Sequence, residues 1–241
     1  MPAKSTPKRA KPKGVQGFTR KLLAWYARTA RDLPWRRTRD PYRVIVSEFM
    51  LQQTQVSRVS EFYPRFLKRF PTIERLAQAR PKAVMEAWDG LGYYARARNL
   101  HRLAKQVSGV GCQVPADPEE LIKLPGVGRY TAGAVACFAY EKPVAAVDTN
   151  VKRVLERVFL GEGRREKDVW ALAERLVPKN GKRAWRFNQA IMELGALVCT
   201  ARSPKCPKCP VRTECLWFTD PGRKPGVKPG VKHRGNRDRS S

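Results

Sequence analysis

The sequence is short of acidic residues. Its 241 residues include 21 Asp and Glu against 49 Lys and Arg, which gives a formal net charge of +28. This balance excludes a typical acidic metabolic enzyme of the cytosol and indicates a polyanionic partner, either nucleic acid or an anionic membrane. No apolar run approaches the roughly 18 residues that span a bilayer, so an integral membrane protein is excluded. The basic N-terminus precedes no apolar stretch, so we expect no secretory signal.

The excess positive charge is spread along the whole chain. Residues 1–14 and 219–241 have too few apolar residues to fold, so both are expected to be disordered basic tails. Each carries a net charge of +5, which leaves +18 on the chain between them. No predicted helix pairs a Lys-rich face with a Trp and Leu face of the membrane-binding type, so we favour nucleic acid as the partner.

Sustained strand alternation is also lacking, and the apolar period is helical instead. Phe18, Leu22 and Tyr26 recur every four residues, and a later stretch repeats this pattern at Phe187, Ile191, Leu194 and Val198. Further helices are predicted at about 42–56, 58–69, 73–78, 81–88, 91–108, 117–123, 129–140, 148–159 and 167–178. Prolines separate many of these stretches. We therefore predict an all-α protein of roughly ten helices with short connections.

Cysteine is scarce, but four of the six cysteines lie close together near the end of the helical region. They are Cys199, Cys206, Cys209 and Cys215. Disulfides are not expected, because the chain shows no sign of secretion. The spacing suits either a structural Zn²⁺ or a [4Fe–4S] cluster. Of the other two, Cys137 lies in an apolar helical run and is expected in the core, and Cys112 has no predicted role.

A glycine hairpin separates two predicted helices at 124–128 (LPGVG). Gly126 and Gly128 permit a tight turn, and the next helix begins at about Arg129. Free backbone N–H groups and the positive end of that helix would form an anion site. The pattern also suits an ordinary helix–turn–helix connection. With the basic body, it predicts that Gly126, Gly128 and Arg129 bind one DNA phosphate regardless of base sequence.

Several stretches together carry a family resemblance. LPGVGRYT at 124–131, VDTN at 147–150 and the four-cysteine loop resemble the helix-hairpin-helix DNA glycosylases of the endonuclease III superfamily. SEFMLQQTQV at 47–56 and GLGYYARARNL at 90–100 closely resemble the adenine DNA glycosylase (MutY) branch, and LPWR at 33–36 and FNQAIMELGALVC at 187–199 add to the match. The resemblance covers about residues 17–217. It implies a [4Fe–4S] cluster on the four cysteines and mismatched double-stranded DNA as the partner. It further implies a monomer without membrane contact, cytoplasmic and nucleoid-associated in a prokaryote.

The resemblance also implies two helical lobes with a cleft between them. Residues 33–141 would form a six-helix domain with the helix-hairpin-helix. The first helix, within 15–32, would pack with an iron–sulfur cluster domain at 142–218. Members of the branch usually carry a further C-terminal domain, related to NUDIX hydrolases, that reads 8-oxoguanine. We expect only the basic tail here, so the sequence leaves open whether 8-oxoguanine is preferred over guanine.

Removal of a base requires protonation of the departing base and stabilisation of the positive charge on the sugar, and two carboxyls in different environments can divide this work. Glu48 lies in an apolar, amide-rich helix, where burial would raise its pKa. The resemblance implies that Glu48 protonates adenine and then activates water, and that Asp148 stabilises the sugar. Asn150 would orient Asp148, and Tyr130 would line the pocket. Taken alone, Glu48 also suits a solvated helix face and Asp148 a helix N-cap.

Other positions refine the implied reaction. The strand-nicking branch has a Schiff-base lysine where this chain has Tyr130, so we predict a monofunctional glycosylase, with weak lyase activity at most from Lys152. The target base must leave the duplex. Gln53 would fill the space that the extruded base leaves in the duplex, or contact the base opposite it. Tyr93 would insert between the stacked bases. The extruded adenine would be framed by Trp35, Arg36, Leu51 and Glu193.

Two alternatives remain open. The usual Asp-Gly-Asn of the branch is Asp148-Thr149-Asn150 here, which is similar to the endonuclease III and thymine-mismatch branches. A thymine or uracil mismatch glycosylase, or an endonuclease III-like pyrimidine glycosylase, is therefore the first alternative. The second is a non-catalytic DNA-binding module with a structural metal.

Overall fold

The computed structural model describes residues 15–109, 111 and 113–219. Both predicted tails, apart from Thr219, and Cys112 lie outside the described residues. Every regular element in the described part is helical, so the predicted all-α fold is confirmed there. Within the same residues, no helix is long and apolar enough to cross a membrane.

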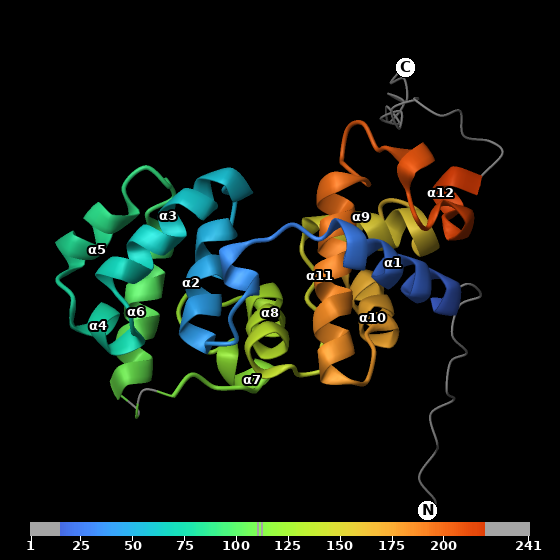
Figure 1. The fold of residues 1–241 in the computed structure, drawn as a ribbon. Coiled ribbons are helices and arrows are strands. Elements are labelled where there is room, and N and C mark those ends of the chain that lie inside the picture. Colours follow the sequence, from blue (N-terminus) through green and yellow to red (C-terminus); the bar gives the residue numbers. More distant parts are fainter. Residues whose placement is uncertain (1–14, 110, 112, 220–241) are drawn as a thin grey trace, which may run out of the picture.

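One group of helices is formed by the middle of the chain (Figure 1). It comprises the short η1 (Pro34–Arg36), α2 (Pro41–Leu51), α3 (Val56–Arg69), α4 (Ile73–Gln78), α5 (Pro81–Trp88), α6 (Ala95–Gly109), α7 (Pro118–Leu121) and α8 (Arg129–Tyr140). The central helix is α2, which contacts α3, α6 and α8. It begins at Pro41, where the preceding Asp40 side chain accepts hydrogen bonds from the Tyr42 and Arg43 amides.

The second group joins the first helix of the chain to the last ones (Figure 1). It comprises α1 (Val15–Thr29), α9 (Thr149–Leu155), the π-helix η2 (Glu156–Leu160), α10 (Glu166–Leu176), α11 (Gly181–Leu197), the short η3 (Cys206–Lys208) and η4 (Arg212–Glu214), and α12 (Leu216–Thr219). The predicted apolar stripes of α1 and α11 meet, with the rings of Phe18 and Phe187 6.4 Å apart and edge to face.

Some predicted boundaries were wrong. The helix predicted at 42–56 ends at Leu51, because Gln53 adopts a left-handed conformation with φ of 56°. The predicted helix 148–159 is divided into α9 and the π-helix η2. The described residues of 33–141 contain the α-helical segments α2 to α8, of which α7 is a single turn, and the six-helix domain stays a prediction. Our proposed domain boundaries, 33 and 141, fall on the stretches that join the two groups.

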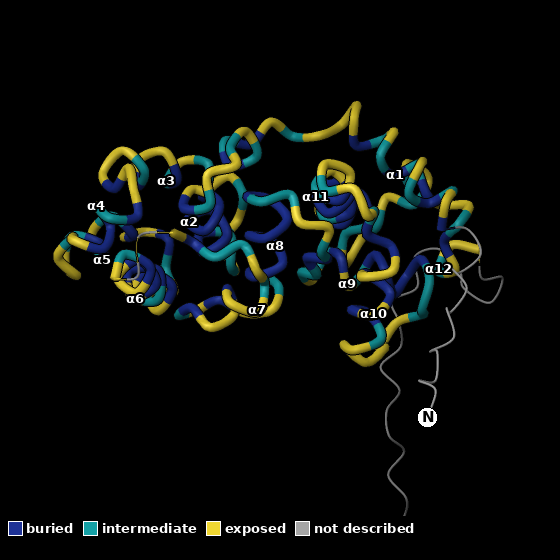
Figure 2. Tube along the Cα trace, turned by 90° about the horizontal axis from the view of Figure 1, so that it is seen from below, coloured by how far each residue is buried: buried dark blue, intermediate teal, exposed yellow. Residues whose placement is uncertain are grey.

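Both groups bury the inward faces of their helices, as Figure 2 shows for the described residues. Cys137 is fully buried within α8, as predicted. One close approach positions the site. A Cβ on Gly133 of α8 would lie 2.3 Å from the carbonyl oxygen of Ala145, so only glycine allows this contact. The segment that leads to Asp148 thereby lies directly against α8.

Candidate active site

A cleft of about 920 Å³ opens between the two groups of helices. This volume lies within the usual range of small-molecule sites in proteins. The predicted site residues that line it are Trp35, Arg36, Glu48, Leu51, Gln53, Tyr130, Asp148, Asn150 and Glu193. Thr149 and Lys152 line it too. The cleft therefore brings together side chains from α2, α8, α9 and α11 that lie far apart in the sequence.

Glu48 is buried in the middle of α2, with only 4% of its surface exposed. Its pKa is raised to about 7, chiefly by burial and also by the nearby charge of Asp148, while a hydrogen bond with Tyr130 acts in the opposite direction. Its Oε2 atom is buried and has no hydrogen-bond partner within the described residues. A carboxyl in this setting holds its proton near neutral pH and leaves one oxygen available to a ligand in the cleft.

Asp148 is the N-cap of α9 and also faces the cleft. Its Oδ1 accepts a hydrogen bond of 2.7 Å from the Val151 amide, and its Oδ2 one of 2.8 Å from Asn150 Nδ2. Burial raises the pKa of Asp148, and these hydrogen bonds oppose the rise because they favour the charged form. The capping interpretation is thus correct, and it places a carboxylate in the cleft beside Glu48.

Asn150 is held from both sides. Its Oδ1 accepts a hydrogen bond of 2.8 Å from Arg153 Nη2, which leaves the amide nitrogen for Asp148. Arg153 also donates to the carbonyls of Gly195, at 2.8 Å, and Cys199, at 2.7 Å. A Cβ on Gly195 would lie 2.6 Å from the Cβ of Asn150, so α11 packs directly against this residue. The orientation of Asn150 is therefore fixed before any substrate arrives.

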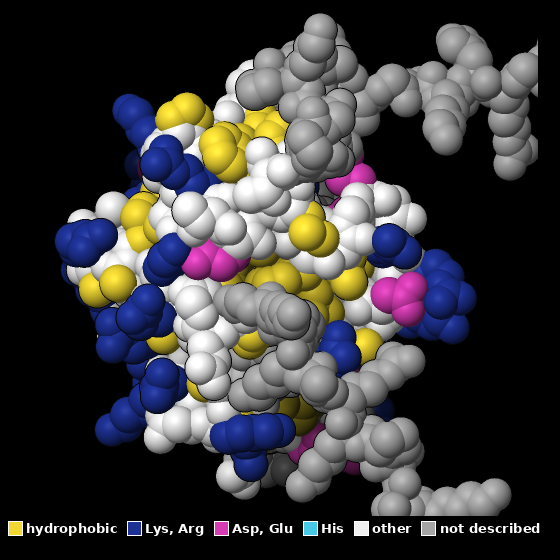
Figure 3. Space-filling view, turned by 90° about the vertical axis from the view of Figure 1, so that its right-hand side faces the viewer, with side chains coloured by type: hydrophobic (Ala, Val, Ile, Leu, Met, Phe, Trp, Pro, Cys, Tyr) yellow, Lys and Arg dark blue, Asp and Glu magenta, His cyan; other side chains and the backbone are white. Residues whose placement is uncertain are grey.

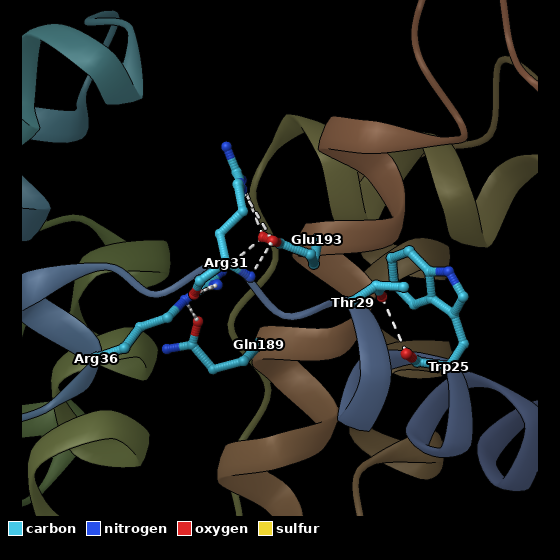
Figure 4. A network of polar contacts seen from close by, with 6 residues as sticks. All are labelled: Trp25, Thr29, Arg31, Arg36, Gln189 and Glu193. Carbon is cyan, nitrogen blue, oxygen red and sulfur yellow. Dashed lines mark hydrogen bonds and ion pairs between the residues drawn. The ribbon is translucent and has the colours of Figure 1, made fainter.

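Glu193 is wholly buried on α11 and accepts four hydrogen bonds, shown in Figure 4. Arg31 donates three, from its amide (3.0 Å), Nε (2.8 Å) and Nη2 (2.9 Å), and Arg36 Nη2 donates one of 2.7 Å. Burial would raise the pKa of Glu193, but these donors outweigh it and lower the pKa to about 2. Because a carboxylate has about four lone-pair sites, all of them are used. In this arrangement Glu193 orients Arg31 and Arg36, which both line the cleft.

Sequence reasoning did not identify Arg31 or Gln189, although both line the cleft. Gln189 Oε1 accepts a 2.8 Å hydrogen bond from Arg36 Nε. Both residues lie in or next to the matched stretches 33–36 and 187–199, and that position is their only signal in the sequence. Tyr93, by contrast, is not part of the cleft wall. It lies on the loop between α5 and α6 and is 63% exposed.

The glycine hairpin forms as predicted, with α8 starting at Arg129 and Gly128 as its N-cap. Gly126 has φ of 78°, and a Cβ there would lie 2.7 Å from the Cβ of Asn99. The Arg129 guanidinium stacks over the Trp170 ring at 4.0 Å and pairs with Glu174 at 2.8 Å. Its side chain thus bridges the two groups of helices, and its contact with a phosphate stays a prediction.

The four predicted ligand cysteines all carry free thiols and line one small cavity beside α9 and α11. Arg157 Nη1 lies 3.6 Å from Cys199 Sγ. Burial and the three other thiols raise the pKa of Cys209 to about 12. No three potential ligands in the described residues are already arranged around one metal ion. Four thiols facing one apolar cavity beside a guanidinium fit an anionic cluster with thiolate ligands.

Comparison with known proteins agrees with this geometry. Residues 46–179 match the HhH-GPD superfamily of base excision DNA repair proteins. The adenine DNA glycosylase of Mycolicibacterium smegmatis is 47% identical over 81% of this chain and 68% of its own length. That of Rattus norvegicus is 46% identical over 83% of this chain, which spans only 42% of the rat protein.

Among solved structures, a thermostable thymine-DNA glycosylase matches with a TM-score of 0.80 and 34% identity, over 86% of this chain and 97% of its own. An endonuclease III–DNA covalent intermediate matches with a TM-score of 0.76 and 25% identity, over 88% of this chain and 98% of its own. The resemblance found in the motifs is therefore confirmed. The chain belongs to the HhH-GPD superfamily of base excision DNA repair proteins and, within it, to the adenine DNA glycosylase branch.

Proposed function

We propose that this DNA glycosylase hydrolyses the N-glycosidic bond of adenine mispaired with 8-oxoguanine or guanine and leaves an abasic site. The observation that carries the proposal is the pairing of two unlike carboxyls across one cleft. Glu48 keeps its proton up to about pH 7, because its pKa is raised to about 7, while the hydrogen bonds from Asn150 and the Val151 amide favour the ionised form of Asp148. Excision by protonation of the leaving base requires one carboxyl in each state.

In the proposed reaction Glu48 donates its proton to a ring nitrogen of adenine as the bond from C1′ to the base breaks. The bonding electron pair leaves with the base, and the sugar becomes an oxocarbenium-like cation. The Asp148 carboxylate stabilises this cation, and Asn150 keeps its oxygens oriented. Glu48, now ionised, accepts a proton from the water that attacks C1′. The enzyme thereby returns to its starting protonation state.

The absence of a Schiff-base lysine at position 130 supports a monofunctional reaction. Tyr130 is partly buried and lines the cleft together with Glu48, so we assign it to the pocket wall beside the acid and not to attack on the sugar. Lys152 is the lysine on the cleft wall and is the residue to which we assign any weak lyase activity.

The same proposal assigns the DNA contacts. Trp35, Arg36, Leu51 and Glu193 frame the extruded adenine, Gln53 and Tyr93 enter the duplex, and Gly126, Gly128 and Arg129 bind a phosphate. Two features support contact with DNA. The described body is strongly basic, and Lys and Arg side chains are spread over the face shown in Figure 3, with few acidic ones. We propose that the enzyme acts as a monomer, nucleoid-associated in the cytoplasm of a prokaryotic host.

We further propose that Cys199, Cys206, Cys209 and Cys215 hold a [4Fe–4S] cluster. Such a cluster would form one iron–thiolate bond with each of the four cysteines and would thereby crosslink the loop 199–215. Arg157 balances the negative charge, because its guanidinium lies against Cys199 and the carbonyls of Thr200 and Ala201. Lys205, Lys208 and Arg212 then form a basic outer face suited to phosphate.

A second candidate is excision of mispaired thymine or uracil. It is favoured by the likeness to the thymine-DNA glycosylase and by Thr149, which lines the cleft beside Asp148. Duplexes with A:8-oxoG, A:G, T:G and U:G pairs, incubated with the enzyme and then treated with alkali, separate the candidates. We expect breaks at the adenine of the first two duplexes only. Breaks at T:G or U:G and none at adenine would overturn the proposal.

A matched pair of variants tests the catalytic assignment in the same assay. Glu48→Gln should abolish adenine excision, whereas Glu86→Gln, at an exposed position on α5, should keep it. Full activity in Glu48→Gln would contradict the role of Glu48. A wild-type enzyme that binds all four duplexes and cleaves none would support the non-catalytic DNA-binding alternative.

A further inference from the structure

Arg96 lies in the first turn of α6 and is buried, with 7% of its surface exposed. It forms no ion pair with any carboxylate of the described residues, and burial lowers its pKa. A buried cation without a carboxylate is costly unless dipoles surround it. The hydrogen-bond acceptors around this guanidinium therefore indicate the role of Arg96.

The guanidinium binds the end of α2 and the loop that follows. Nη1 donates to the carbonyl oxygens of Phe49 (3.1 Å), Met50 (2.8 Å) and Gln52, and to Thr54 Oγ1 (3.0 Å). The last carbonyls of a helix have no partner within the helix, and a cation there also opposes the negative end of the helix dipole. Arg96 thus serves as the cap of α2.

The second terminal nitrogen binds another loop. Nη2 donates to the carbonyls of Leu91 and Gly92, each at 3.0 Å. The guanidinium also lies 5.4 Å from the centre of the Trp88 ring and 5.5 Å from that of Tyr93. The four hydrogens on Nη1 and Nη2 are thereby shared among six acceptors, four on the end of α2 and its following loop and two on the loop before α6, about 40 residues later.

Both loops hold a strained residue next to this guanidinium. Only three non-glycine residues of the described chain have positive φ, and two of them are Gln53, at 56°, and Tyr93, at 46°. The third, Glu141, caps α8 elsewhere. A left-handed conformation is unfavourable for a residue with a Cβ, so surrounding contacts must hold it. The carbonyls that Arg96 binds directly precede these two residues, at Gln52 and at Gly92.

We propose that Arg96 is a positioning residue that joins these two loops into one rigid platform, so that Gln53 and Tyr93 reach the duplex together. The inference rests on the proposed function, in which both residues enter the DNA to extrude adenine. Because the loops are ordered in the folded enzyme, the cost of ordering them is met during folding and does not oppose extrusion. Lysine cannot replace arginine here, since one ammonium lacks the planar fork that spans both loops.

The test compares wild type with Arg96→Lys and Arg96→Met. Arg102→Lys serves as the control, because Arg102 lies on the exposed side of the same helix. Single-turnover excision is measured on two substrates. One is a duplex with a single A:G mispair in otherwise complementary strands, and the other is a duplex whose adenine lies in an unpaired bulge. The bulged adenine is already unstacked, so it needs little help to leave the helix.

We expect Arg96→Lys to slow excision from the paired duplex about tenfold or more and from the bulge less than about threefold. Arg102→Lys should match wild type on both. In addition, 2-aminopurine placed at the adenine position should fluoresce less when bound by Arg96→Lys, because less of it is extruded. Equal slowing on both substrates, or no slowing on either, would overturn the proposal.

Folding and the proposed function are checked separately. A melting temperature for Arg96→Lys near that of wild type shows that this variant is folded. If Arg96→Met does not fold, the conclusion is drawn from Arg96→Lys alone. Amide hydrogen exchange in residues 52–55 and 91–94 should rise together in Arg96→Lys, and unchanged exchange would overturn the platform. This measurement needs no substrate. A wild-type enzyme that leaves adenine in place therefore refutes the proposed function without deciding the role of Arg96.

Discussion

Replacing Glu48 with Gln should destroy excision and make the protein more stable at alkaline pH. The pKa of Glu48 is raised from 4.5 to about 7 in the folded state. Between these values the folded chain binds more protons than the unfolded chain, so the free energy of unfolding falls as pH rises from about 4.5 to 7. Above pH 7 the ionised, buried carboxylate destabilises the fold. Glutamine has a similar shape and stays neutral at every pH.

The size of the effect follows from the shift. A rise from 4.5 to about 7 corresponds to about 3 kcal/mol at 1.36 kcal/mol per pH unit. At pH 8 nearly all of this penalty applies, whereas at pH 5 it is below about 1 kcal/mol. For a folded part of this size, each kcal/mol moves the melting temperature by roughly 2–4 °C. Glu48→Gln should therefore melt about 6–12 °C above wild type at pH 8 and only slightly above it at pH 5.

Calorimetry of wild type and Glu48→Gln at pH 5 and pH 8 gives the change in melting temperature caused by the substitution at each pH. The prediction is that this change is larger at pH 8. Glu86→Gln removes an exposed glutamate of α5 and should show no pH-dependent gain. A Glu48→Gln variant that melts at or below the wild-type temperature at pH 8 would refute the reasoning, because Glu48 would then be either unburied or stabilised as an anion.

Three further predictions follow from the site. The single-turnover excision rate should rise with pH as Asp148 ionises, at a pKa raised above 3.8, and fall as Glu48 loses its proton near pH 7, giving a bell-shaped profile in a quench-flow assay. Gly195→Ala places a Cβ 2.6 Å from the Cβ of Asn150 and should lower the single-turnover rate about tenfold or more while DNA affinity, measured by anisotropy, stays near wild type. Cys209→Ser should lose iron in metal analysis together with the yellow-brown absorbance near 400 nm, and a zinc-loaded, colourless wild-type protein would contradict the cluster.

The sequence predicted the fold where a helix carries its own signals. The helix predicted at 129–140 coincides with α8, because Gly128 precedes it and nine of its residues form a continuous buried run. The end of α2 was wrong because no nearby Pro or Gly encodes it. That helix stops where Gln53 turns to positive φ, and the group that binds its last carbonyls is Arg96, which lies over 40 residues later. When a distant residue ends a helix by binding its last carbonyls, the sequence around the helix end contains no residue pattern that predicts it.

The residues of the site also fall into those that the sequence predicts and those that it does not. Glu48 and Asp148 were recognised because they lie in motifs whose residue types state the chemistry. Arg31, Arg96 and Arg153 were not, although each makes several buried or half-buried contacts. They are three among 49 basic residues, and most basic residues lie at the surface. Which arginine turns inward is decided by the carbonyls and carboxylates that the fold places around it, and no residue pattern records this.

The pairing of α1 with α11 has a consequence for synthesis. The ribosome delivers the middle helices, from α2 to α8, as a continuous block that can fold while the chain is still growing. The first helix is synthesised long before its partners, because Phe18 packs on Phe159 of η2 and on Phe187 of α11. Until these later helices are made, the apolar stripe of Phe18, Leu22 and Tyr26 lacks its native contacts. The order of the helices therefore delays burial of this apolar stripe until the last third of the chain is made.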